Sequence, residues 1–106
     1  MKVFIQIEDS AKFNEFYEKM KEFAKICNKQ FDKQKKKLEK IGVVLPEILH
    51  VVYKDKEREN VVVIENSLDL GLGNWFLRRA VSKNLRKAIE EYLKENKIEG
   101  KIIKIV

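Results

Sequence analysis

Few residues in this chain have side chains of the kind that catalyse reactions or hold metal ions. There is one histidine and one cysteine, and the sequence contains no cluster of ligands with metal-site spacing. His50 shares a predicted strand face with Ile48 and Val52, which favours a hydrogen-bonded structural imidazole. Cys27 falls in an apolar helical stripe, where a thiol behaves as a small hydrophobic group. We therefore predict no catalytic residue, no metal ion and no cofactor.

Two short segments contain residue types that also occur in active sites. Asp55, Glu57 and Glu59 alternate with basic residues in a predicted turn, which is typical of a solvated loop whose charges neutralise one another. The Gly-Leu-Gly segment at 71–73 precedes a predicted helix, where free amides attract anions. It lacks the third glycine of a dinucleotide-binding loop and the Gly-Lys-Ser/Thr of a Walker loop. The chain is therefore predicted not to be an enzyme.

Basic residues are the more informative chemistry, because the net charge of +6 permits a polyanionic partner. In a helix expected from about 74 to 96, a rotation of about 100° per residue separates an apolar side from a basic side. The apolar side carries Leu77, Val81, Leu85, Ala88 and Tyr92. Cations that follow phosphates, beside rings on which bases stack, are typical of single-stranded nucleic-acid sites. The candidate nucleic-acid-binding residues on this helix are Trp75, Phe76, Arg78, Arg79, Lys83, Arg86 and Lys87. A solvated outer face is the alternative interpretation.

A second basic stretch lies on the predicted first helix, and it adds Lys33, Lys36 and Lys37 to the candidate set for single-stranded or duplex nucleic acid. The same stretch carries a narrow seam with coiled-coil spacing. The seam residues are Phe31, Gln34, Leu38 and Ile41. An isolated helix would leave this seam exposed to water, so the sheet, a second copy or another protein is expected to cover it. Homodimerisation or binding of another protein is thus the alternative function.

The elements that position these residues follow from hydrophobic periodicity in a single domain, 1–106. Alternation and apolar runs predict strands at 2–8, 48–55, 60–65 and 101–106. Helices are predicted at about 10–41 and 74–96, and Gly42 and Pro46 end the first. An unbroken first helix would be about 45 Å long, so it either breaks near Asn28 or projects.

This order of elements predicts an α+β fold, the βαββαβ ferredoxin-like sandwich, with four antiparallel strands and both helices on one face. The first and third strands would be central, because they are the most apolar. The unbroken run Val61–Ile64 is typical of a central strand.

A hairpin ending at Asn66 is followed by a helix with Trp75 near its start and Arg78 and Arg79 in its first turns. In this pattern the segment from about 48 to 106 resembles the KH-like N-terminal domain of the bacterial replication initiator. The resemblance implies an alternative fold, KH-like α+β with a long N-terminal helix, and an interaction module linked to replication. That family begins with two short helices, whereas this chain begins with a strand and a long helix, so no functional residue is transferred.

Composition predicts the cellular compartment of the protein. One cysteine cannot form an internal disulfide, and no apolar run approaches the ~20 residues of a membrane span. We therefore expect a cytoplasmic protein with no membrane partner. Charged residues make up 38 % of the chain, mostly lysine and glutamate, which favours a heat-adapted source.

Overall fold

Four strands and two α-helices form the fold in a computed structural model that describes residues 1–44, 48–66 and 75–106, without the side chains of 75–78. The chain is α+β, as predicted. Its elements are β1 (Lys2–Ile7), a 3₁₀ turn (Ser10–Lys12), α1 (Phe13–Glu39), β2 (His50–Lys54), β3 (Val61–Asn66), α2 (Trp75–Glu95) and β4 (Gly100–Ile105).

The strands form one sheet in the order β2-β3-β1-β4, and each strand is antiparallel to its neighbours. β1 and β3 are central, as their apolar sequences predicted. In β3 the run Val61–Ile64 is at most 1 % exposed, which agrees with its position between two neighbouring strands. Phe4 of β1 pairs with Val63 of β3, and Val63 pairs in turn with Tyr53 of β2.

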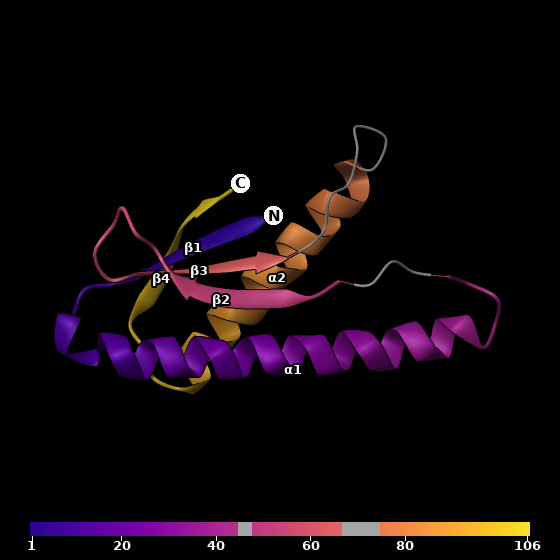
Figure 1. The fold of residues 1–106 in the computed structure, drawn as a ribbon, viewed down its shortest axis with the longest axis horizontal. Coiled ribbons are helices and arrows are strands. Elements are labelled where there is room, and N and C mark those ends of the chain that lie inside the picture. Colours follow the sequence, from indigo (N-terminus) through magenta and orange to yellow (C-terminus); the bar gives the residue numbers. More distant parts are fainter. Residues whose placement is uncertain (45–47, 67–74) are drawn as a thin grey trace.

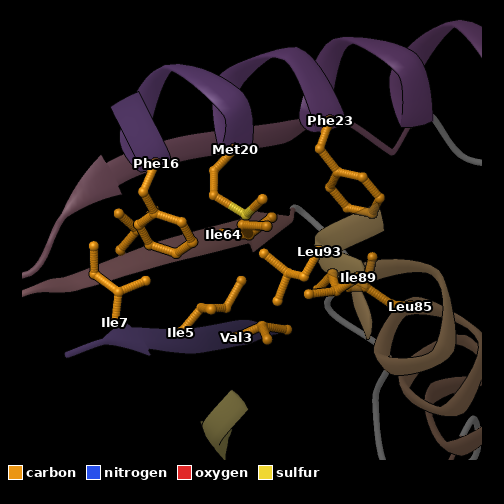
Figure 2. Close-up of a cluster of buried hydrophobic side chains, with 11 residues drawn as sticks. Val3, Ile5, Ile7, Phe16, Met20, Phe23, Ile64, Leu85, Ile89 and Leu93 are labelled. Atoms are coloured by element: carbon orange, nitrogen blue, oxygen red, sulfur yellow. The ribbon is translucent and has the colours of Figure 1, made fainter. Parts of the chain in front are cut away.

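The hydrophobic core lies between one face of this sheet and the two helices (Figures 1 and 2). Apolar residues at every second position of β1 and at spacings of three or four in the helices meet in one cluster. The sheet contributes Val3, Ile5, Ile7, Val62 and Ile64, α1 contributes Phe16, Met20 and Phe23, and α2 contributes Leu85, Ile89 and Leu93. The other face of the sheet carries no helix of the described residues (Figure 1).

The first helix begins and ends inside the predicted range of about 10–41. The Asp9 side chain accepts a hydrogen bond from the Ala11 amide at 3.0 Å, which caps a 3₁₀ turn, so the α-helix begins only at Phe13. It ends at Glu39, and Gly42 then takes the left-handed conformation, with φ of 85°. Gly42 thus has the helix-terminating role that its position predicted.

α1 is continuous across Asn28 and therefore projects beyond the sheet (Figure 1). The side chain of Asn28 marks the point of departure. Its Oδ1 accepts from the His50 amide at 2.8 Å, and its Nδ2 donates to the His50 carbonyl at 3.1 Å. Residues 29–44, which follow this contact, are called the lysine arm below.

The buried side of α2 differs from the predicted one. Leu85, Ile89 and Leu93 are buried, whereas Val81, Ala88 and Tyr92, which were predicted to be inside, are only half-buried. Leu77 has a side chain outside the described residues. A row of residues spaced by four drifts around the helix axis, and a helix that crosses its neighbours at an angle buries such a row.

Candidate nucleic-acid interface

The basic side of α2 is exposed. Arg79, Lys83, Arg86 and Lys87 all face solvent, on the side of the helix away from buried Leu85. None of the four forms an ion pair within the part of the chain that the structure describes. Three other predicted residues, Trp75, Phe76 and Arg78, belong to the first turns of α2, and their side chains lie outside the described residues.

The charges of α2 run against the helix dipole. Carboxylates stabilise a helix near its N-terminus and cations near its C-terminus. The first turn of α2 holds no acidic residue and basic residues follow it, whereas Glu90, Glu91 and Glu95 lie near the C-terminal end, beside Lys94 of the last turn. α1 has the favourable arrangement, with Glu15 in its first turn and lysines in its last. Helix stability therefore does not account for the basic side of α2.

The lysine arm is a second basic surface. Lys33, Lys36 and Lys37 are exposed, and Lys36 Nζ lies 3.1 Å from Asp32 Oδ2, so one of the three predicted lysines is paired. The arm lies on the opposite side of Asn28 from the part of α1 that packs on the sheet.

The predicted seam of this helix is not a uniform stripe. Phe31 and Leu38 are half-buried, and Gln34 is exposed. Ile41 is 74 % exposed and lies in the turn after the helix, because α1 ends two residues earlier, at Glu39. The chain then turns back, and the Val43 amide donates to the Leu38 carbonyl at 2.9 Å.

The two basic surfaces lie on helices that cross and then diverge (Figure 1). The crossing is marked by Phe23 and Tyr92, whose ring centroids are 5.2 Å apart. The Tyr92 hydroxyl also donates to Glu22 Oε2 at 3.3 Å. Burial and this carboxylate raise the pKa of Tyr92, so its hydroxyl stays a neutral donor at physiological pH. The predicted nucleic-acid-binding residues thus divide into an α2 group and an arm group.

The two reactive side chains in the sequence have structural surroundings. His50 Nδ1 lies 3.0 Å from Asn28 Oδ1, and burial lowers the pKa of the imidazole. Cys27 packs at the margin of the core, and burial raises the pKa of its thiol to about 11. The thiol is therefore protonated at neutral pH and is a poor nucleophile. In the predicted turn, Asp55 Oδ1 accepts a hydrogen bond from the Glu57 amide at 3.2 Å, which is a local turn contact.

A third basic surface, which was not predicted from the sequence, lies on the face of the sheet without helices. Two cations lie near the ring of Phe4 there: Arg58 Cζ is 5.3 Å and Lys104 Nζ is 5.9 Å from its centroid. Alternation in β1 signals that Phe4 points away from the core residues Val3 and Ile5. The two cations come from a loop and from another strand, so only the folded chain brings them together.

A further hollow in the described part of the surface is largely acidic. A cleft of about 420 Å³ near the start of α1 is lined by the carboxylates of Glu8, Asp9, Glu15 and Glu99, with Lys12 and Lys97, and this charge disfavours an anion. Among the described residues, no three histidine, cysteine or carboxylate side chains are grouped as metal ligands. No helix in the described ranges is long and apolar enough to cross a membrane.

Comparisons with known proteins found no relative of this chain. No family model matches it, and neither a curated protein nor a solved structure matches it. The resemblance of residues 48–106 to the KH-like domain therefore stays a prediction.

Proposed function

We propose that this chain is a non-enzymatic, cytoplasmic nucleic-acid-binding module and that its main contact surface is the basic side of α2. One observation supports this above all: Arg79, Lys83 and Arg86 are exposed together, and they have no ion-pair partner among the described residues. We also propose a ferredoxin-like fold. Its support is the strand order β2-β3-β1-β4 with antiparallel neighbours and both helices on one face.

The physical basis of such binding is the release of counterions. A cation that neutralises a phosphate frees a condensed counterion, so affinity falls as salt rises, with a slope of about −0.7 per contact for single strands and about −0.9 for duplexes. The lysine arm adds further cations on a separate helix. Binding of this kind holds the backbone and does not read sequence.

The test is a charge-matched pair of triple variants. Arg79→Gln, Lys83→Gln and Arg86→Gln remove three charges from α2, and Lys19→Gln, Lys21→Gln and Lys25→Gln remove three from the part of α1 packed on the sheet. We expect affinity of the α2 variant for a single strand to fall less steeply with salt. The slope of log affinity against log salt should become less negative by about 2, since each lost contact contributes about 0.7. Equal slopes for the two triple variants, measured by fluorescence anisotropy, would contradict the proposal.

A second candidate, self-association through the lysine arm, is favoured by a separate observation. Six of the seven large apolar side chains that are exposed in the described part of the chain lie between residues 26 and 51. They are Ile26, Ile41, Val43, Val44, Leu49 and Val51. Ile41, Val43 and Val44 belong to the arm, so a second copy seated on the arm would cover this part of the exposed apolar surface.

Salt separates the two candidates. Pairing two lysine arms brings like charges together, and salt screens that repulsion, so self-association should strengthen as salt rises, whereas nucleic-acid binding weakens. Sedimentation at several protein and salt concentrations measures this, and Ile41→Glu, at an exposed turn position, should abolish any dimer. A monomer at every concentration excludes self-association.

A further inference from the structure

The sheet face without helices is a continuous surface with its own composition. Strand pairing places Lys2, Phe4, Gln6, Val51, Tyr53, Val61, Val63, Glu65, Lys101 and Lys104 on it, because directly paired residues point to the same side. One row crosses all four strands: Tyr53, Val63, Phe4 and Lys104. An aromatic and aliphatic row therefore ends at a cation on β4.

Two buried valines of β3 lie at the centre of this face. Val61 and Val63 are 0 % and 1 % exposed although no helix covers them, so the side chains around them on the same face shield them. Phe4 and Tyr53 remain half-exposed on either side of Val63. Because these two rings are carried by paired strands, little conformational entropy is lost when a planar ligand binds them.

Basic residues lie on this face beside the Phe4 ring. Arg58, from the loop between β2 and β3, and Lys104 are both exposed and both lie within 6 Å of the Phe4 ring centroid. Neither forms an ion pair with a described residue, although the exposed carboxylates of Glu57 and Glu59 flank Arg58 in sequence. The strands add Lys2 and Lys101 to this face, together with the carboxylate of Glu65. Asp55, whose amide donates to the Val61 carbonyl at 2.9 Å, adds a second carboxylate near Tyr53.

Tyr53 contributes a second, more polar position. Burial, together with the neighbouring Glu65 carboxylate, raises the pKa of the Tyr53 hydroxyl, so this group remains a protonated donor at neutral pH. Glu65 lies opposite Lys2 and Val51 in the register, one row away from Phe4. The carboxylates that act on Tyr53, Glu65 and Asp55, are thus at other register positions than the pair of Phe4 and Lys104.

We propose that this face is a second, independent binding site, which takes single-stranded nucleic acid by stacking a base at Phe4 and Arg58 and holding the adjoining phosphates at Lys104 and Lys101. Bases stack on aromatic rings and guanidinium planes in single-strand sites, and cations follow the backbone. Within a duplex each base is already stacked on its neighbours, so its faces cannot reach Phe4. The site therefore selects single strands.

This site does not depend on the basic side of α2. α2 packs on the opposite face of the sheet, so variants of the two surfaces change different contacts (Figure 1). Failure of one surface to bind can accordingly be separated from failure of the other.

The first test uses anisotropy of a labelled oligo-dT of about 12 nucleotides, within the ~4–16 nucleotides that small single-strand-binding folds cover. The variant Arg58→Gln with Lys104→Gln changes only exposed side chains. Its control, Lys54→Gln with Lys25→Gln, removes the same charge and includes a cation that lies 5.1 Å from the Tyr17 ring centroid, against α1. We expect the site variant to lower affinity about 10-fold or more and the salt slope by about 0.7 per cation, with the control close to wild type.

Phe4→Leu distinguishes stacking from charge. It keeps an apolar side chain but removes the ring, so affinity for oligo-dT should fall while the salt slope is unchanged. Duplex binding should be unaffected by either site variant.

A crosslinking experiment on the unaltered protein does not depend on how the variants fold. Oligo-dT with one 5-iodouracil is irradiated in the complex, and mass spectrometry locates the adduct. Adducts on the peptides of Phe4 or Tyr53 support the site. Adducts on α2 alone, together with a site variant that binds like its control, overturn it and leave the α2 proposal standing. Loss of binding in the site variant with no effect of the α2 triple variant supports the sheet site and overturns the α2 surface. Absence of binding by the wild type overturns both.

Discussion

The two halves of α1 are one continuous helix, yet they serve different purposes. The first half, up to Cys27, buries Phe16, Met20, Phe23 and Ala24 and carries three acidic and three basic residues. The second half, from Asn28, has no buried residue, and lysines dominate its charge. A helix can therefore supply a core with one half and a charged, partly apolar surface with the other. The difference lies in side chains alone, because the backbone is the same.

The largest expected difference between the halves is in stability. Met20 is 0 % exposed, so Met20→Ala removes buried methylenes and leaves a cavity, which should lower the free energy of unfolding by about 2–5 kcal/mol. Leu38→Ala, on the half-buried seam, should cost about 1 kcal/mol, near the average for point substitutions. Urea denaturation of both variants measures the contrast. Equal losses would mean that the arm contributes to the core as much as the first half does.

The boundary between the halves should respond next most strongly. Asn28→Ala leaves the His50 amide and carbonyl without their partner, which should lower the free energy of unfolding by about 1–3 kcal/mol. Faster hydrogen exchange at the His50 amide would localise the effect. Asn14→Ala, at an exposed position near the start of α1, is the matched control and should change little.

Acid should act at the same boundary. Burial lowers the pKa of His50 in the folded state below its ordinary value of about 6.5, so the unfolded chain binds more protons once the pH falls below that value. The contribution of neutral His50 to stability is therefore complete above about pH 6.5 and is lost as the pH falls towards the folded pKa. Urea denaturation at pH 7.5 and pH 5.5 should show this loss, and His50→Gln should reduce it. A pH dependence that survives the substitution would assign it to other groups.

The smallest expected effect concerns exposed ion pairs, and one pair is taken from each half for comparison. Lys21 Nζ lies 3.0 Å from Glu18 Oε1, and Lys36 Nζ lies 3.1 Å from Asp32 Oδ2. Because solvent screens such pairs, Lys21→Gln and Lys36→Gln should each change stability less than any of the substitutions above. If the arm contacts phosphate, Lys36→Gln alone should reduce the salt slope of nucleic-acid binding. Thermal unfolding and anisotropy read the two effects separately.

Local patterns predicted the elements because each depends on short spacings. The apolar run at Val61 to Ile64 indicated a central strand, and Gly42 indicated the end of the helix. The buried side of α2 was only partly predicted. Ile89 and Leu93 follow Leu85 at spacings of four residues, so this apolar row was visible in the sequence beside the predicted one through Ala88 and Tyr92. The sequence does not say which of the two rows faces the sheet, because that depends on how the helix packs on it.

The candidate surfaces differ in the same way. The basic side of α2 was visible in the sequence because its cations repeat at helical spacing. The surroundings of Phe4 were not, because Lys104 reaches it through a register that shifts between Phe4 and Ile5, and Arg58 reaches it from a loop. The contact of Asn28 with His50 spans 22 residues and depends on how the chain returns from the arm.

That contact also protects an edge of the sheet. β2 is an outer strand, and its free backbone groups would otherwise be available to a strand of another molecule. The Asn28 amide pairs with both the N–H and the C=O of His50, as a neighbouring strand would, and so occupies the edge where β2 begins. The Asn28 side chain thus blocks intermolecular strand pairing at this end of β2. Removing the side chain would favour aggregation as well as unfolding.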